Sequence, residues 1–585
     1  MNQKKIDPEI LRHSAGHVLA AAVIKLFPGT KLGIGPATED GFYYDFEFDK
    51  SITQKDLKKI EKQAKKIIGQ NLEFQKKEIP AKKAIKYFEK QNQPYKVELI
   101  QELIDQKNIK QVSLYELGDF VDLCKGPHLE STKQIDPGAF KLLRLAGAYW
   151  KGDEKNKMLS RIYGVVFNSK EELAKKLKIL EEAQKRNHRK LGKELELFAI
   201  FPQIGQGLPV WLPKGYTIRR ILEDYMIKME RFYGYTHVLT PVINKKELFE
   251  TSGHLKFYKD SMYSPLEIDN ETFYLKPMNC PAEMMIYNMK PRSYRDLPFK
   301  MGEFGTVHRY EKSGELHGLQ RVRGFTQNDA HIFCTPDQLE DEFMEVIELF
   351  EKFFKDVGFK DYKYRLSLGG DDKSKYVGPK ERWDWAQEVM RKTLKKNKVK
   401  FYEEENEAAF YGPKIDVQAI NVFGKEDSIG TNQIDFNLPE SFDLNYIDKK
   451  GNKQRPFVIH RALIGSFERF FAFFIEYYAG AFPVWLSPIQ VMIIPVSEKF
   501  NAYANQVKKR LFSEEIRSET DNTDDSLGKK IREAQKQKIP YMLIVGQKEE
   551  KSLKVSVRSR EKGNEGAVKL TVFINRVKNQ VADYK

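Results

Sequence analysis

The chain contains little cysteine and no long hydrophobic run. Only 3 of its 585 residues are Cys, and they are widely separated, which excludes a disulfide framework and leaves free thiols or metal ligands as their expected roles. The most apolar stretch, FFAFFIEYYAGAFPVW, follows Arg469 and is interrupted by Glu476. It falls short of the roughly 20 uninterrupted apolar residues that span a membrane, so we expect a buried core helix.

A secretory signal is also lacking. The first residues, MNQKKIDPEILRH, place Asp7 and Glu9 before any apolar run and offer no small-residue cleavage site, which predicts a cytoplasmic protein. Acidic residues are outnumbered, because 99 Lys and Arg against 83 Asp and Glu give a net charge of +16. This basic excess favours a polyanionic partner, with nucleic acid as the first candidate.

The length predicts several domains, and the periodicity of the sequence separates them. Domains of roughly 100–200 residues would number about three to five in this chain. Segment 168–193 combines a capping-box signature at Ser169 and Glu172 with a leucine stripe, which predicts a long linking helix. The runs MGEFGTVHRYE and GFTQNDAHIFC alternate as in an antiparallel sheet. Beyond Pro488, the apolar runs IQVMIIPV and PYMLIVG alternate with helices and predict a small parallel or mixed α/β domain.

One group of His and Cys residues has a regular spacing. His13 and His17 lie four residues apart in HSAGHVLAAAV, and Cys124 and His128 repeat that spacing in DLCKGPH. On a helix, this spacing places two imidazoles on one face, where they can converge on one point. The four groups together would suit either a tetrahedral zinc site or a hydrolytic pocket.

A second group is scattered along the chain. Cys280 lies in KPMNCPAEM, His331 in NDAHIFC and His460 in IHRALIGSFERF, and no periodicity brings them into one site. Cys334 fits a buried thiol best.

Longer segments carry a family resemblance. HRYEKSGELHGLQRVRGFTQNDAHIF and GSFERF resemble motifs 2 and 3 of class II aminoacyl-tRNA synthetases, and YGYTHVLTPVI resembles motif 1, the dimer-forming element. Together with MNCPAEM and AAFYGPKID, in this order, they make nearly the whole chain similar to the threonyl-tRNA synthetase family of bacterial type. The resemblance implies a multidomain α+β and α/β protein. Its expected parts are an α+β editing domain (1–167), a linker helix (168–193), a class II antiparallel-sheet catalytic domain (194–486) and an α/β anticodon-binding domain (487–585).

The resemblance implies an ATP site with Mg²⁺. Arg309 and Arg469 would clamp the phosphates through planar forked donors. Glu311 would accept from the adenine amino group, and Phe325 would stack on the ring with Arg469 on the other side. Arg321 would hold the outer phosphates, which Mg²⁺ would bridge.

By the same resemblance, Cys280, His331 and His460 match three zinc ligands with an open position, which the amino and hydroxyl groups of threonine complete. Valine lacks the hydroxyl and would be rejected by roughly 10⁴ or more, whereas serine would lose only about 1–3 kcal/mol. We therefore expect serine errors. The other residues that match the threonine pocket are Gln327, Asp329, Tyr411, Lys414 and Gln433.

A second, hydrolytic pocket is the general answer to such errors. The residues that match the family's editing-site motifs are His13, His17, Cys124 and His128, with Lys96 and Asp122 as helpers. We expect acid–base and water-positioning roles, with His13 and Lys96 leading proton transfer, and keep a zinc ion as the alternative. Arg532, Glu549 and Arg558 match positions that read single-stranded anticodon bases.

The implied activity is ATP-dependent ligation of threonine to tRNA(Thr) by a cytoplasmic homodimer with no membrane association, together with hydrolysis of seryl-tRNA(Thr). Three departures from the family pattern stand out. The ubiquitin-like domain that usually precedes the editing domain is expected to be absent. Asp427 and Ser428 replace a Trp and Gln pair, and Asp524 and Ser526 replace an Asn and a Lys, so contacts at the active site and the anticodon are expected to differ.

Three alternatives share some of these features. A class II synthetase for proline or serine would carry motifs 2 and 3 but would not need Cys280, His331 and His460 together. A non-catalytic, tRNA-binding or regulatory relative would not need Arg309 and Arg469. A stand-alone editing hydrolase would not need the catalytic region of about 300 residues, which is longer than many whole domains.

Overall fold

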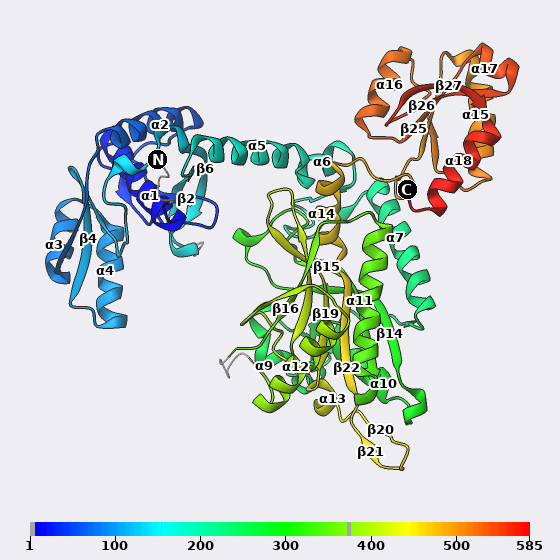
Figure 1. Cartoon of the computed structure of the whole chain (residues 1–585), viewed down its shortest axis with the longest axis horizontal. Coiled ribbons are helices and arrows are strands. Elements are labelled where there is room, and N and C mark those ends of the chain that lie inside the picture. The colour runs from blue at the N-terminus through cyan, green and yellow to red at the C-terminus, as the bar shows by residue number, and fades with distance from the viewer. Residues whose placement is uncertain (1–5, 154, 371–375) are drawn as a thin grey trace. The chain divides into compact units, whose positions relative to one another are not determined.

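The computed structural model describes residues 6–153, 155–370 and 376–585, and the chain divides into two compact units, Met1–Glu181 and Glu182–Lys585 (Figure 1). Within the described residues, no helix combines the length and the apolar character needed to cross a membrane. Cys124, Cys280 and Cys334 are free thiols.

The first unit is an α+β structure with two antiparallel sheets. The larger sheet has the order β1-β2-β7-β6, and the smaller has the order β3-β4-β5. The apolar faces of α1 and α2 form one hydrophobic core with the larger sheet, because small and aliphatic residues such as Ala15, Val18 and Ile60 are fully buried there. The elements are α1 (Pro8–Leu26), β1 (Lys31–Leu32), β2 (Phe42–Glu47), α2 (Gln54–Gly69), β3 (Phe74–Pro80), α3 (Ala81–Lys90), α4 (Pro94–Lys107), β4 (Gln111–Leu117), β5 (Phe120–Leu123), β6 (Phe140–Tyr149) and β7 (Met158–Val166).

The segment expected to form one long helix forms two. Helix α5 (Lys170–Arg186) begins where predicted, because the Ser169 hydroxyl accepts from the Glu172 backbone N–H at 3.2 Å. Helix α6 (His188–Glu194) starts again after Asn187, whose side chain accepts from the backbone N–H groups of Arg189 and Lys190. A side chain that caps a new helix at this position interrupts the first one.

The second unit is built on an eight-stranded sheet of order β10-β14-β15-β22-β19-β18-β16-β17. Its central strands are antiparallel and only the two edge pairs are parallel, so the antiparallel class II sheet is confirmed. The two runs predicted as strands are β14 and β15. The strands are β10 (Thr236–His237), β14 (Phe299–His308), β15 (Gly324–Cys334), β16 (Tyr362–Ser367), β17 (Phe401–Glu404), β18 (Lys414–Ile420), β19 (Glu426–Asp435) and β22 (Phe457–Ser466).

Helices cover this sheet, and the run FFAFFIEYY forms α14, a buried core helix as predicted. Phe470, Phe471 and Phe474 in α14 are fully or almost fully buried in the main core, against Phe350 and Phe354 of α11. The helices of this region are α7 (Pro213–Phe232), α8 (Lys246–Thr251), α9 (His254–Phe257), α10 (Cys280–Asn288), α11 (Leu339–Asp356), α12 (Lys380–Lys396), α13 (Leu438–Ser441) and α14 (Phe467–Tyr478). Short strands at the periphery are β8 (Phe198–Ala199), β9 (Val210–Trp211), β11 (Ile243–Lys245), β12 (Leu266–Ile268), β13 (Glu271–Leu275), β20 (Tyr446–Ile447) and β21 (Lys453–Gln454).

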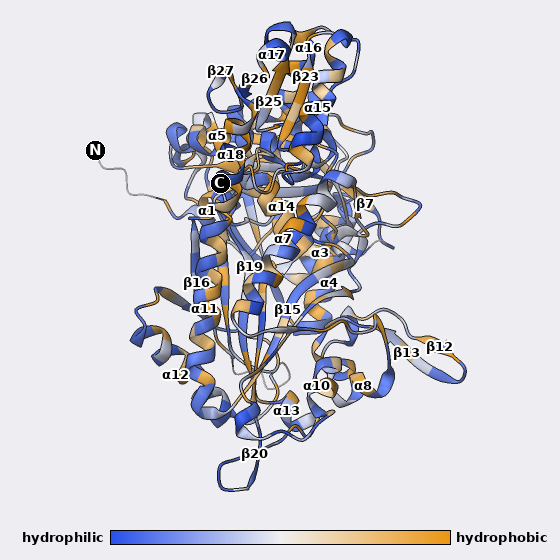
Figure 2. Ribbon diagram, turned by 90° about the vertical axis from the view of Figure 1, so that its right-hand side faces the viewer, coloured by the Kyte–Doolittle hydropathy of each residue, from blue (hydrophilic) through white to orange (hydrophobic). Residues whose placement is uncertain are grey.

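The C-terminal part has a five-stranded mixed sheet of order β24-β23-β25-β26-β27, parallel among the first three strands and antiparallel beyond. Strands β23 and β25 stand out as hydrophobic in Figure 2, as expected for strands buried on both faces. The predicted α/β domain is confirmed. Its elements are β23 (Val491–Pro495), α15 (Asn501–Phe512), β24 (Ser518–Thr520), α16 (Leu527–Lys536), β25 (Tyr541–Val545), α17 (Gln547–Ser552), β26 (Lys554–Ser559), β27 (Gly563–Lys569) and α18 (Leu570–Ala582).

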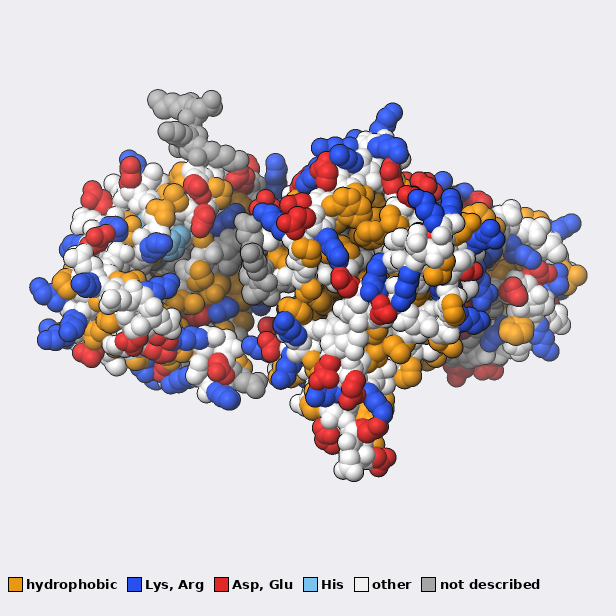
Figure 3. Space-filling model, turned by 90° about the horizontal axis from the view of Figure 1, so that it is seen from below, with side chains coloured by type: hydrophobic (Ala, Val, Ile, Leu, Met, Phe, Trp, Pro, Cys, Tyr) orange, Lys and Arg blue, Asp and Glu red, His pale blue; other side chains and the backbone are white. Residues whose placement is uncertain are grey.

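The basic excess is not segregated on the face of the molecule shown in Figure 3. On the face shown in Figure 3, Lys and Arg side chains are mixed with Asp and Glu and with hydrophobic side chains. The net charge of +16 therefore does not gather into one basic patch on this face.

Candidate functional site

A cavity of about 770 Å³ opens on the large antiparallel sheet. Cys280 and His460 lie in its wall. The lining also includes every residue expected at the ATP and threonine sites, which are Arg309, Glu311, Arg321, Phe325, Gln327, Asp329, Tyr411, Lys414, Gln433 and Arg469. Their roles stay predictions, but their convergence is a fact of the fold.

The register of the sheet explains how residues so far apart in sequence meet. Alternate residues of a strand point to one face, so the odd-numbered positions of β15 from 325 to 331 share the face that lines the cavity. Across the strands, His331 pairs with His460, His460 with Gln433, and Gln433 with Lys414. Four candidate residues thus form one row across β15, β22, β19 and β18.

Four arginines line the cavity, and three of them, Arg309, Arg321 and Arg469, are the residues expected at the phosphates. The Arg321 Nε donates to Glu311 at 2.7 Å, and the Arg469 Nε donates to the Gln320 carbonyl at 3.1 Å. Burial lowers the pKa of Arg469; the carboxylate of Asp427 opposes this effect, and the cations Arg309 and Arg321 add to it. A cluster of guanidinium groups in one cavity is suited to binding a polyphosphate.

The aromatic ring expected to stack on adenine has a cation beside it. The guanidinium carbon of Arg309 lies 5.0 Å from the centre of the Phe325 ring. The guanidinium in contact with this ring is therefore that of Arg309, whereas we expected Arg469 on the other side of the base.

One thiol and two imidazoles form a compact set of possible metal ligands, those of Cys280, His331 and His460. Their candidate ligand atoms all lie within 4.8 Å of one another, and all three residues are buried. The Nε2 atom of His331 lies 3.0 Å from the Nδ1 atom of His460. One thiol and two imidazoles at this spacing fit a zinc ion that keeps a position open for substrate. Burial raises the pKa of the Cys280 thiol to about 11, and a bound cation would deprotonate it.

Two residues that the sequence reasoning missed, Glu283 and Asp435, contact this set, and a third, Asn279, contacts the neighbouring Asp329. Nδ1 of His331 lies 2.9 Å from the Glu283 carboxylate, Nε2 of His460 lies 2.8 Å from Asp435, and the Asn279 amide donates to Asp329 at 3.2 Å. Burial raises the pKa of Glu283 to about 7, against the influence of His331. The only signal in the sequence was spacing, since Glu283 follows Cys280 by three residues on a helix.

The amino-acid side of the cavity is ordered by hydrogen bonds. The Tyr411 hydroxyl donates to the Gln433 amide oxygen at 2.6 Å, and the Tyr411 ring stacks on His460 with ring centres 4.9 Å apart. Lys414 forms an ion pair with Asp416 at 3.0 Å. These contacts hold Gln433 and Lys414 in place beside the candidate metal ligands.

The departure from the family pattern at Asp427 and Ser428 falls on the cavity wall. Ser428 lines the cavity, and its hydroxyl accepts from the Gln418 amide at 2.7 Å. Asp427 accepts from Asn421 at 3.0 Å. The hydroxyl of the shorter Ser428 side chain is therefore already hydrogen-bonded to Gln418.

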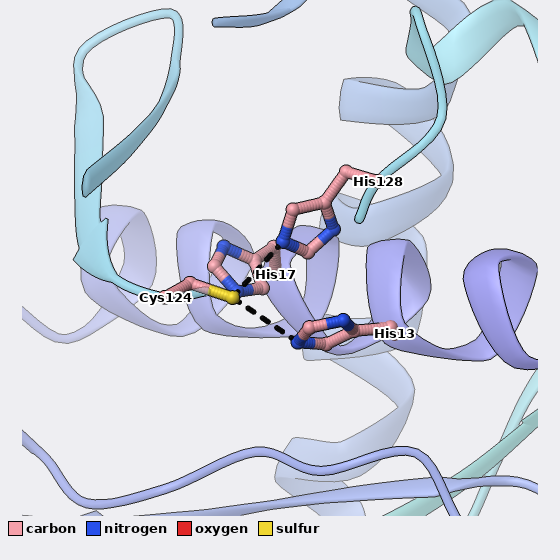
Figure 4. A group of neighbouring side chains, drawn as sticks. All are labelled: His13, His17, Cys124 and His128. Atoms are coloured by element: carbon pink, nitrogen blue, oxygen red, sulfur yellow. Dashed lines mark hydrogen bonds between the residues drawn. The ribbon is translucent and has the colours of Figure 1, made fainter. Parts of the chain in front are cut away.

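The first His and Cys group is assembled within the first unit (Figure 4). His13 and His17 project from one face of α1, while Cys124 and His128 come from the chain that follows β5. Sγ of Cys124 lies 3.2 Å from Nε2 of His13 and 3.2 Å from Nε2 of His128. The four candidate ligand atoms lie within 4.8 Å of one another. We call these four residues the editing cluster.

Burial keeps the editing cluster uncharged. It lowers the pKa of His128 to about 2, with the imidazoles of His17 and His13 adding to the effect, and it lowers the pKa of His13. It also raises the pKa of the Cys124 thiol to about 11. Neutral imidazoles can accept a proton or bind a metal, so this geometry permits both of the roles considered.

A buried ion pair lies behind the cluster. Lys96 contacts Asp122 at 2.6 Å, and their side chains are each only 2% exposed. The Tyr44 hydroxyl donates to Asp122 at 2.6 Å, and Asp122 lies 3.7 Å from Nε2 of His17. Asp122 thus links Lys96 to His17, which places both predicted helpers at the cluster.

The three anticodon candidates lie on three different elements of the C-terminal part. Arg532 is on α16, Glu549 on α17 and Arg558 on β26. Within the part of the chain that the structure describes, no hydrogen bond or ion pair joins any two of them. Glu549 accepts from the Gly546 N–H at 3.1 Å and so caps α17. Ser526, one of the two residues that depart from the family pattern in this domain, is the N-cap of α16.

The buried carboxylate of Glu468, which lies near Arg219, should titrate near neutrality. Burial raises the pKa of Glu468 from 4.5 to about 7, against the influence of Arg219, while Glu468 accepts from the Thr326 N–H at 3.0 Å. Between these two pKa values the folded state binds more protons than the unfolded state, so stability falls as the pH rises from 4.5 towards 7.

Glu468→Gln removes this titration and keeps the acceptor. We expect the variant to gain stability relative to the wild type by up to about 3 kcal/mol more at pH near 8 than at pH near 5. Thermal melting of both proteins at the two pH values measures it. A difference that does not change with pH would contradict the raised pKa.

Comparison with known families and structures agrees with this geometry. Residues 263–478 match the family described as "tRNA synthetase class II core domain (G, H, P, S and T)". Residues 490–580 match "Anticodon binding domain", and residues 112–163 match "Threonyl and Alanyl tRNA synthetase second additional domain". The last match runs from β4 into β7 and includes Cys124 and His128.

Whole-chain relatives are similar along nearly the full length. The threonine–tRNA ligase of Geobacillus sp. (strain WCH70) is 50% identical over 575 residues, which cover 98% of this chain and 88% of the relative. The threonine–tRNA ligase 1 of Bacillus subtilis (strain 168) is 49% identical over 99% of this chain and 89% of its own.

Solved structures show the same fold. The "RNA binding domain of Threonyl-tRNA synthetase" from Cryptosporidium parvum Iowa II matches with a TM-score of 0.63 and 35% identity, over 68% of this chain and 98% of that one. The prolyl-tRNA synthetase of Giardia lamblia, at 16% identity over 70% of this chain and 81% of its own, has a TM-score of 0.55 and shows the fold alone. From these matches and the convergence of its motifs in one cavity, the chain belongs to the threonine–tRNA ligase family of class II aminoacyl-tRNA synthetases.

Proposed function

We propose that the chain activates L-threonine with ATP and transfers it to the 3′ end of tRNA(Thr). The observation that carries this proposal is one cavity whose wall holds Cys280 and His460 of the Cys–His–His donor set together with Arg309, Arg321 and Arg469. The donor set selects the amino acid, and the arginines hold the nucleotide. No covalent catalyst is needed, because adenylate formation depends on positioning and charge stabilisation.

The residues of the cavity divide the work between the two substrates. Arg309 and Arg469 bind the phosphates together with Mg²⁺, and their charge stabilises the pentavalent phosphate as diphosphate leaves. Arg321 must release its partner Glu311 to reach the outer phosphates, which frees Glu311 for the adenine amino group. Binding of ATP thus replaces the Arg321–Glu311 contact of the free protein by two contacts, one from Arg321 to the phosphates and one from Glu311 to adenine.

On the amino-acid side, Asp329 accepts from the threonine amino group, and Gln327, Tyr411, Lys414 and Gln433 complete the pocket. A zinc ion held by Cys280, His331 and His460 would supply coordination positions for the amino and hydroxyl groups. That arrangement rejects valine strongly and serine weakly.

We propose that the editing cluster hydrolyses seryl-tRNA(Thr). His13 is only partly buried and is the group best placed to take a proton from water, while Lys96 and Asp122 orient His17 behind it. A zinc ion bound by His13, His17, Cys124 and His128 is the alternative, which the spacing of their ligand atoms permits.

Further parts of the proposal concern organisation. We assign 1–167 to editing, 168–193 to the linker, 194–486 to catalysis and 487–585 to anticodon reading by Arg532, Glu549 and Arg558. A homodimer is supported by exposed apolar side chains at and near motif 1, since Phe232 is 85% and Leu239 is 83% exposed, an exposure typical of interaction surfaces. We place the protein in the cytoplasm.

Amino-acid-dependent ATP–pyrophosphate exchange with all twenty amino acids tests the activity. We expect strong exchange with threonine, weak exchange with serine, none with valine and about one zinc per chain. Two zinc ions per chain would favour a metal in the editing cluster. If no amino acid supports exchange while tRNA still binds, a regulatory tRNA-binding role replaces the proposed one. The substitution at Ser428 in the cavity wall would then be the first candidate cause of the lost activity.

A further inference from the structure

Each histidine of the candidate zinc centre has a buried carboxylate on the side away from the other ligands. We propose that Glu283 and Asp435 are positioning residues that select which ring nitrogen of His331 and of His460 faces the metal, and thereby set the zinc affinity of the centre. This inference rests on the proposed zinc centre, and nothing in the family pattern quoted above assigns either residue.

Glu283 comes from the same helix as the thiol ligand. It follows Cys280 by three residues in α10, so both side chains leave one face of the helix. Its Oε2 atom lies 2.9 Å from Nδ1 of His331, and both side chains are 0% exposed. Nε2 of His331 is left facing Nδ1 of His460 at 3.0 Å.

Asp435 makes the corresponding contact to His460 with the opposite nitrogen. Its Oδ2 atom lies 2.8 Å from Nε2 of His460, and its side chain is 0% exposed. Its Oδ1 atom accepts from the backbone N–H groups of Asn437 and Leu438 at 2.7 and 3.0 Å. The start of α13 therefore holds this carboxylate in place, and Nδ1 of His460 faces the centre.

The two contacts decide the tautomers. A carboxylate that accepts from one ring N–H leaves the other nitrogen unprotonated and makes it a better ligand. His331 must then present Nε2 and His460 must present Nδ1, and these are the two atoms that approach each other. Within the described residues, neither carboxylate oxygen of Glu283 nor Nδ1 of His331 has a hydrogen bond of standard geometry, although Oε2 and Nδ1 lie 2.9 Å apart. The contact between Glu283 and His331 is therefore one of charge and proximity, and this buried carboxylate also favours a cation nearby.

Zinc affinity of the full-length protein tests the inference. Competition with a chromophoric chelator should show zinc binding about 10- to 100-fold weaker in Glu283→Gln and in Asp435→Asn than in the wild type. Cobalt(II) substitution should give a changed visible spectrum in both variants. Excess zinc should restore threonine-dependent exchange, because neither residue is required to touch the substrate.

The same fold offers a matched control. Glu476 contacts Nδ1 of His188 at 2.7 Å, and both side chains are buried, but among the described residues neither belongs to a group of side chains that could hold a metal ion. Glu476→Gln should therefore lower the melting temperature without changing zinc affinity.

The outcomes separate the inference from its premise. If the wild type binds no zinc, the zinc centre itself is wrong, and the inference falls with it. If the wild type binds zinc and both variants bind it equally well, only the positioning role is overturned. Equal losses of zinc affinity in Glu283→Gln, Asp435→Asn and Glu476→Gln would show that the effect is general destabilisation, and the positioning role would again be overturned.

Discussion

Threonine-dependent ATP–pyrophosphate exchange is expected to disappear when Cys280 is replaced by Ser or His331 by Ala. Each change removes one of three donors that lie within 4.8 Å of one another, so the centre can no longer hold a metal ion in a fixed geometry. We expect a loss of about 10³-fold or more, equivalent to about 4 kcal/mol of transition-state stabilisation. Zinc content should fall in parallel.

Cys334→Ala provides the control for this prediction. Cys334 is a fully buried free thiol three residues from His331 on the same strand, but on the opposite face, because side chains alternate along a strand. Its loss should lower stability and leave exchange and zinc content unchanged. Exchange that survives in Cys280→Ser without bound zinc would show that threonine is activated without a metal.

Accumulation of seryl-tRNA(Thr) is the expected result of combining His13→Ala with Cys124→Ala. Both residues belong to the editing cluster in the first unit, whereas the ATP and threonine residues all lie in the second unit. Hydrolysis of seryl-tRNA(Thr) should fall about 10²- to 10⁴-fold, the range typical of lost acid–base catalysis. Charging with threonine should be unchanged.

A chelator distinguishes the two mechanisms considered for the cluster. If water is positioned by imidazoles alone, removal of metal from the wild type should abolish exchange and leave seryl-tRNA hydrolysis intact. If the cluster holds zinc, both activities should be lost. Hydrolysis that persists at the wild-type rate in the double variant would remove the cluster from the reaction altogether.

The sequence predicted local structure well, since local structure follows from local periodicity. The alternation of MGEFGTVHRYE and GFTQNDAHIFC corresponds to β14 and β15, and FFAFFIEYY forms the buried helix α14. The chain could not reveal from periodicity that the predicted linker helix stops before Asn187, because capping by that side chain depends on the backbone around it.

For the candidate site, the sequence could name the residues but could not predict their spatial arrangement. Resemblance to a family named the residues of the cavity, but the row from His331 through His460 and Gln433 to Lys414 exists only because four strands pair in one register. The pairing of Arg321 with Glu311 was also beyond reach of the sequence, although both residues were named. Hydrogen bonds between side chains depend on distances of a few tenths of an ångström that sequence spacing does not determine.

What the sequence by itself determined was the family, the types of its elements and the identity of the groups that can do chemistry. Only the tertiary structure decided which buried charges support them. Glu283 and Asp435 stand behind His331 and His460, and Lys96 is held by Asp122 behind His17. The physical reason is that a charge is stable inside a protein only next to a partner, and such partners are brought together by packing between distant segments.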